Sequence, residues 1–254
     1  MMRAFVIATV VLGVLVWMPV APAEEAAAEG GSDAVVKAVM EQWSKLNSMT
    51  ANIDADAKLP AGETTTDIVG KGTMAYLKKG DKVMSRLEMS ARMAQSTSDM
   101  DLANVLVVYD GEKAAVQYKV IGRMQYRALP VEDADVAGAD GQIVLDLLGK
   151  YFALKALPEE KIGEDEVYVL EGTPTFELPS DAPLQGVKVC FAKATGVPLK
   201  LVVYHTDGSV LLDMRFKDIK VNPEIGEDRF VVPSPPPEPA PATPVAPPAE
   251  GEGK

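Results

Sequence analysis

Residues 187–232 decide the fold, and their sequence is VKVCFAKATGVPLKLVVYHTDGSVLLDMRFKDIKVNPEIGEDRFVV. It contains four strand-like segments, VKVCFAK, PLKLVVYHT, VLLDMRFKDI and RFVV. Turns at Thr195 and Gly196 and at Asp207 and Gly208, and a loop at 222–224, separate them. An Asp-Gly pair between apolar alternations is a strong hairpin signal, because glycine accepts the positive φ of a tight turn. The stretch predicts an antiparallel meander of four strands.

The third segment shows the alternation most clearly. Asp213, Arg215 and Lys217 share one face, while the intervening positions are apolar. This period of two is typical of a strand with one buried face. The predicted buried face carries Val210, Leu212, Met214 and Phe216.

Upstream, two helices and further strands are predicted. Ser32 is the expected N-cap of a helix over 33–47, whose apolar residues recur every three or four positions. The same spacing predicts a helix over 141–154. A hairpin is expected over 104–120, with its turn at Asp110 and Gly111. Residues 91–101 receive no assignment. Further strands are expected near 49–57, 67–79, 82–89, 124–128 and 167–174. Gly70 and Gly72 inside a strand predict a bulge or sharp bend.

The two ends of the chain differ from the part between them, and the N-terminal end predicts export. Residues 1–23 have a basic start, an apolar stretch and small residues before Glu24, so we expect a signal peptide cleaved after Ala23 and a periplasmic protein; a retained membrane anchor is the alternative. A linker at 24–32 and one domain at 33–232 follow. Residues 233–254 hold nine of the 19 prolines and predict a disordered tail, with a docking motif as the alternative.

Composition argues against several function classes. The net charge of −12 disfavours nucleic acid or an anionic membrane surface as a partner. Cys190 is the one cysteine, so no intrachain disulfide can form, and a small buried hydrophobe is expected there rather than a reactive thiol. The single histidine, His205, excludes paired-histidine zinc motifs, and the chain has no nucleophile elbow or phosphate-binding glycine loop.

These features predict a protein that is not an enzyme and has no catalytic residue, metal or cofactor. A base at His205 is the weaker alternative, and the acidic pair Glu159 and Glu160 is expected in a solvated loop. A curved sheet with two helices across its apolar face has either an open cavity that can bind acyl chains or other apolar groups, or a core that its own methionines fill. The predicted lining is Val39, Trp43, Leu46, Met74, Tyr76, Leu147, Leu148 and Tyr151.

The order of these elements resembles the LolA-type periplasmic carriers of outer-membrane lipoproteins and their LolB-like relatives. The matching pieces are WSKLNSMTANI, GKGTMAYLKKGD, VVYDGEKAAVQYKV, ATGVPLKLVVYHTDG and VNPEIGEDRFVVPSP, in that order. The resemblance implies a mainly β fold with helices, an open and curved antiparallel β-barrel capped by α-helices.

By the same resemblance, the function would be non-catalytic transport of lipid or lipoprotein acyl chains by a monomer, between an inner-membrane donor and an outer-membrane acceptor. Lys78 stands where the carriers place an arginine that tethers the lid, which makes it a lid candidate. The alternative is an envelope sensor or protein-interaction module on the same scaffold, with a filled core and no lipid cargo.

Overall fold

The computed structural model describes residues 31–61, 64–95, 101–120, 123–129, 145, 148–175 and 184–235. The predicted signal peptide, nearly all of the linker, residues 141–144, 146 and 147 of the second predicted helix and the tail from 236 onward lie outside these residues. Within them, no helix has the length and apolar character that crossing a membrane would require.

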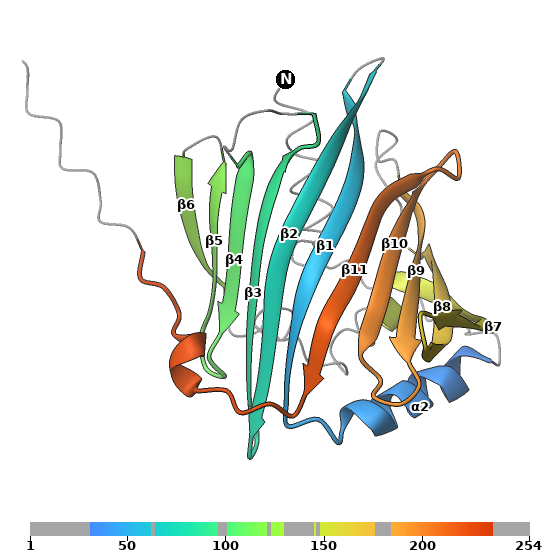
Figure 1. The fold of residues 1–254 in the computed structure, drawn as a ribbon, viewed down its shortest axis with the longest axis horizontal. Coiled ribbons are helices and arrows are strands. Elements are labelled where there is room, and N and C mark those ends of the chain that lie inside the picture. Colours follow the sequence, from blue (N-terminus) through green and yellow to red (C-terminus); the bar gives the residue numbers. More distant parts are fainter. Residues whose placement is uncertain are drawn as a thin grey trace, which may run out of the picture.

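Eleven strands form one antiparallel sheet in the order β6-β5-β4-β3-β2-β1-β11-β10-β9-β8-β7 (Figure 1). The strands are β1 (Ser48–Ala61), β2 (Thr64–Lys79), β3 (Lys82–Met93), β4 (Ala103–Tyr109), β5 (Ala114–Val120), β6 (Arg123–Leu129), β7 (Phe152–Ile162), β8 (Asp165–Pro174), β9 (Leu184–Ala192), β10 (Pro198–His205) and β11 (Val210–Val221). The described residues also form α2 (Ser32–Trp43) and the 3-10 helix η1 (Glu227–Phe230), and residues 145 and 148–151 of the second predicted helix are helical as well.

The sheet consists of two sequential meanders, β1–β6 and β7–β11, that meet where β1 pairs with β11. Ile53 shows the junction, because it lies opposite Gly72 of β2 on one side and Phe216 of β11 on the other. Strands β6 and β7 are at opposite ends of the order, so the sheet is not closed. The predicted open antiparallel sheet is therefore confirmed, and the turns at Gly111 and Gly208 have the expected positive φ.

Alternation gives the sheet two different faces. On β1, Met49, Ala51, Ile53 and Ala55 are buried, and we call the face that they share the inner face. Asn52, Asp54 and Asp56 point to the opposite, outer face. The main hydrophobic core lies on the inner face and includes side chains of α2 and of both meanders.

Helix α2 differs from its prediction at both ends. Its N-cap is Gly31, while Ser32 is buried as the first helical residue. The helix ends at Trp43 instead of continuing to Asn47, and Leu46 donates its backbone N–H to Trp43 in a tighter turn. The shorter helix lets the chain enter β1 at Ser48.

Strand β7 was missed in the sequence interpretation, which expected Phe152–Leu154 in a helix and Glu159 and Glu160 in a loop. Phe152 instead lies opposite Pro174 of β8, and the pairing continues to Ile162. The apolar residues of this segment fit either period, and pairing with β8 decides in favour of the strand.

The last predicted strand, RFVV, is also wrong, because η1 ends at Phe230 and irregular chain follows it. Residues 222–235, here called the C-terminal strap, cross the lower ends of β1, β2 and β3 (Figure 1). The Asn222 side chain accepts the backbone N–H groups of Asn47 and Ser48 at 2.7 and 3.3 Å. Phe230 is 1% exposed and packs in a cluster with Ala75 and Met84 on the outer face.

The predicted bulge at Gly70 and Gly72 is absent. Strand β2 keeps an unbroken register with β1 and with β3 through both glycines. A Cβ on Gly72 would lie 2.3 Å from the backbone oxygen of Glu88 and 2.4 Å from the Met89 sulfur. Gly72 is needed because Met89 crosses this part of β2 closely.

Candidate functional site: the inner face of the sheet

Helix α2 lies across one end of the inner face, beside β7 and β8 (Figure 1). The turn between β9 and β10 also contacts it, since a Cβ on Gly196 would lie 2.6 Å from the backbone oxygen of Val39. Val39 itself is fully buried in the inner-face core. The apolar stripe of α2 therefore packs on the second meander, as its spacing predicted.

Trp43 connects α2 to the first meander. Its ring meets that of Tyr76 on β2 edge to face, with centroids 5.8 Å apart and planes at 66°. Trp43 is 4% exposed, and its Nε1 donor has no hydrogen-bond acceptor within the described part of the chain. A buried donor without an acceptor destabilises a fold by roughly 1–3 kcal/mol, so a carbonyl or carboxylate placed beside this indole N–H would be favoured.

The structure brings most of the predicted site residues together. Tyr151 is half-buried against the main cluster, whereas Lys78 is exposed and lies outside it. The backbone N–H of Lys78 donates to Asn47, so this position joins β2 to the end of the α2 segment through its backbone. The side chain of Leu147 lies outside the described residues. The members of the cluster are Val39, Trp43, Leu46, Met74, Tyr76 and Leu148, whose role as a cavity lining stays a prediction.

Several apolar residues beyond the predicted site are incompletely buried on the inner face. Leu87 of β3, Met214 and Phe216 of β11 are half-buried and pack against the main cluster. Met214 and Phe216 belong to the apolar face that the alternation of 210–217 predicted, and Leu212 beside them is buried. The alternation identified this face, but not which of its residues would stay partly open.

The candidates for chemistry lie on the second meander. His205 is at the β10–β11 turn, where its Nδ1 accepts the backbone N–H of Asp207 at 3.2 Å. Cys190 is buried, and that burial raises the pKa of its thiol. In the described ranges, no three histidine, cysteine or acidic residues are grouped closely enough to hold a metal ion.

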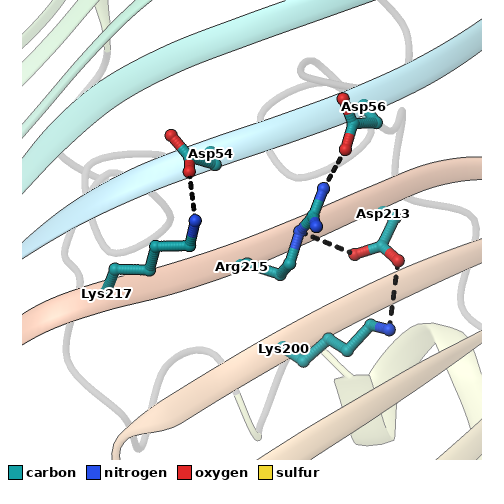
Figure 2. A network of polar contacts seen from close by, with 6 residues as sticks. All are labelled: Asp54, Asp56, Lys200, Asp213, Arg215 and Lys217. Atoms are coloured by element: carbon teal, nitrogen blue, oxygen red, sulfur yellow. Dashed lines mark hydrogen bonds and ion pairs between the residues drawn. The ribbon is translucent and has the colours of Figure 1, made fainter.

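The outer face of β1, β10 and β11 carries a ladder of ion pairs (Figure 2). Lys217 donates to Asp54 at 2.5 Å, and this hydrogen bond lowers the pKa of the Asp54 carboxyl. Arg215 pairs with Asp56 and lies 3.5 Å from Asp213. Lys200 completes the ladder 3.0 Å from Asp213. This surface is polar and mutually paired, in contrast to the inner face.

A hollow of about 680 Å³ lies on the other half of the outer face, over β2–β6. Its outward side chains form two neighbouring rows across the strands. The first row is Lys71, Ser90, Asn104, Lys119 and Met124, and the second is Thr73, Glu88, Leu106 and Gln117. A second hollow, of about 500 Å³, lies beside the C-terminal strap.

No family model and no curated protein matches the chain. Solved structures resemble it at low identity. The MucA/MucB complex of Pseudomonas aeruginosa is 16% identical, with a TM-score of 0.44 over 80% of this chain and 61% of that chain. An uncharacterized conserved protein from Thermus thermophilus is 13% identical, with a TM-score of 0.46 over 78% of this chain and 91% of that chain.

A LolA superfamily protein from Nitrosomonas europaea is 13% identical, with a TM-score of 0.33 over 78% of this chain and 96% of that chain. The chain spans less than two thirds of the length of the MucB chains. The similar structures thus include a member of the LolA superfamily.

Proposed function

We propose that the protein is a periplasmic carrier that shelters the hydrocarbon chains of lipids or lipoproteins on its inner face, without making or breaking a bond. The observation that carries this proposal is the incomplete burial of Leu87, Met214 and Phe216 beside a closed apolar cluster. A guest chain laid against these residues would complete their burial. The predicted leader at 1–23 supports export of the carrier.

The energy available from such burial is sufficient for transport. Each CH₂ group removed from water contributes about 0.8 kcal/mol. Burial of half of a long acyl chain would therefore contribute several kcal/mol, which is enough to keep the chain bound to the protein in aqueous solution. Release requires an acceptor with a higher affinity, so transfer would follow differences in affinity between donor, carrier and acceptor.

The unpartnered indole N–H of Trp43 supports a guest with an oxygen acceptor near its chain. An ester or amide carbonyl beside the acyl chain would suit this donor. The same indole offers a readout, because Trp43 is buried next to Tyr76 and a nearby guest would change its emission.

The test is titration of the purified protein with a brominated fatty acid, whose bromine quenches tryptophan emission at short range. We expect saturable quenching in the wild type and at least tenfold weaker binding in Phe216→Gln, because this change places an amide on the inner face. Val231→Gln is the control, since Val231 is 67% exposed beyond η1. Circular dichroism checks that both variants are folded.

Equal binding by all three proteins would remove Phe216 from the site. Native mass spectrometry of protein taken from its own envelope should also show a lipid or lipoprotein of defined mass. A protein that is empty in that measurement and does not bind the brominated probe contradicts the carrier proposal.

A second function, an envelope sensor or protein-interaction module, is favoured by the tight core under α2. Val39, Trp43 and Tyr76 fill that end of the inner face with the protein's own side chains. Pull-down from envelope extract with the full chain, in the presence and absence of excess fatty acid, separates the two functions. Capture of a defined protein that fatty acid does not displace would support the interaction module.

A further inference from the structure

Strands β2–β6 of the first meander are basic, although the chain as a whole is acidic. Strands β2–β6 contain nine lysine and arginine residues and two acidic residues, Asp67 and Glu88, while the chain carries −12. The other described acidic residues of this region, Asp81, Asp101, Asp110 and Glu112, lie between the strands. A local basic surface on an acidic protein is a feature that a negatively charged partner can recognise.

Two of these basic residues, Lys71 and Lys119, line the hollow on the outer face. The β-ladder register places Lys71, Ser90, Asn104 and Lys119 in one row that crosses β2, β3, β4 and β5. The two lysines occupy the ends of the row, and hydroxyl and amide groups lie between them. Adjacent strands are about 4.8 Å apart, so the two lysine positions are separated by about 14 Å along the sheet.

The charged groups around the hollow differ in whether they already have an ion-pair partner. Glu88 is bound by Arg86 at 2.9 Å. Lys71 lies opposite Asp54 of β1, which Lys217 already binds. Lys119 is exposed and forms no ion pair with any described residue. The net charge that a ligand would meet along the row is therefore positive, and Lys119 is the more available cation.

We infer that this hollow is a docking site for an extended, acidic segment of a partner protein. An extended chain advances about 3.3 Å per residue, so two carboxylates four residues apart on the same side would be about 13 Å apart and match the lysine spacing. Ser90, Asn104 and Gln117 would bind the backbone between them. Leu106 and Met124 provide a small apolar floor.

The inference does not depend on the carrier function, because it concerns the opposite face of the sheet. A membrane surface is a poorer occupant, since an anionic bilayer would repel the rest of a protein with charge −12. The chain's own segment 236–254 contains three glutamates and follows in sequence the C-terminal strap, whose Phe230 packs on the outer face, so it is the competitor that the experiment must separate.

The test uses the purified full chain and fluorescein-labelled peptides, with binding followed by anisotropy at low salt. The probe SETVTES has its glutamates four residues apart, SEETVTS has them adjacent, and SQTVTQS is neutral. We expect SETVTES to bind at least tenfold more tightly than SQTVTQS and about threefold more tightly than SEETVTS. Lys119→Gln and Lys71→Gln should each weaken it three- to tenfold, and added salt should weaken it further.

Lys37→Gln is the control, because Lys37 is an exposed lysine on α2, away from the hollow. Equal binding of SETVTES and SQTVTQS, or an equal loss in Lys37→Gln, overturns the inference. A synthetic peptide of residues 236–254 that binds more tightly than SETVTES and loses affinity in Lys119→Gln would assign the hollow to the chain's own tail. Binding of phosphatidylglycerol vesicles through Lys119 without peptide binding would also overturn it.

Discussion

Lys188 on β9 donates a hydrogen bond of 2.7 Å to Glu160 on β7, although β8 lies between these strands. The register of β7 shifts between Leu157 and Glu160, and the outer face here holds a buried apolar cluster that includes Val167 and Cys190. The ion pair therefore lies beside a second core, on the opposite side of the sheet from α2.

We predict a small but measurable coupling between Glu160 and Lys188. The hydrogen bond to Glu160 raises the pKa of Lys188, so its contribution is present below the ordinary lysine pKa of 10.5 and is lost as pH rises through the raised value. A double-mutant cycle with Glu160→Gln and Lys188→Gln should give a coupling of about 0.5 kcal/mol in urea unfolding at pH 7. The coupling should disappear as pH rises through the raised pKa of Lys188.

The matched control for this cycle is Lys161→Gln, an exposed change on the same strand. It should change the free energy of unfolding equally in the presence and absence of Glu160. A coupling that persists when Lys188 is deprotonated would show that packing, and not charge, joins the two residues.

The outer ion-pair ladder predicts sensitivity to acid. The pKa of Asp54 is lowered chiefly by the hydrogen bond from Lys217, so its stabilising effect is present above the unfolded-state pKa of about 3.8. The effect is lost as pH falls through the lower, folded-state value. Urea midpoints should therefore fall more steeply below pH 4 in the wild type than in Asp54→Asn. Asp101→Asn, a change away from the ladder, should follow the wild-type curve.

Gly72→Ala should destabilise the sheet by about 2 kcal/mol, because its methyl group would approach Glu88 and Met89 far inside van der Waals distance. Gly149→Ala is the control, since a Cβ there meets no atom within 4 Å. It should be neutral or slightly stabilising. Thermal unfolding followed by circular dichroism measures both, and similar melting temperatures for the two variants would contradict the close-packing explanation.

Phe230→Ala should release the C-terminal strap. Loss of a buried phenylalanine destabilises its cluster by about 3 kcal/mol, and Phe230 packs with Ala75 and Met84. Limited proteolysis should then cut within the strap much faster than in the wild type. Val231→Ala, next to it but exposed, should leave the cleavage rate unchanged; equal rates for all three proteins would show that Phe230 does not hold the strap.

The sequence was most informative where a strand has one buried face and a tight turn. The alternation of β11 and the Asp-Gly turns predicted the hairpins β4–β5 and β10–β11, because these signals are local. The sequence was misleading at β7 and at the segment RFVV, residues 229–232. Their apolar residues are compatible with several conformations, and contacts with β8 or with the outer face of β2 and β3 select one of them.

The candidate site was predicted in part. Helical spacing placed Val39 and Trp43 on a buried stripe, and the structure packs them with Tyr76. Lys78 was proposed from the family resemblance, and the structure leaves its side chain exposed outside the cluster. The polar hollow could not be predicted, because Lys71 and Lys119 are 48 residues apart and share a row only through the register of four strands.

The junction of β1 with β11 has a consequence for folding kinetics. Every other strand pair joins neighbours in the chain, whereas Ile53 and Phe216 must find each other across most of the sequence. Closing so long a loop is slow, because the chain loses conformational entropy before the favourable contacts between β1 and β11 have formed. The two meanders should therefore form early, and their union through β1 and β11 should be the rate-limiting event.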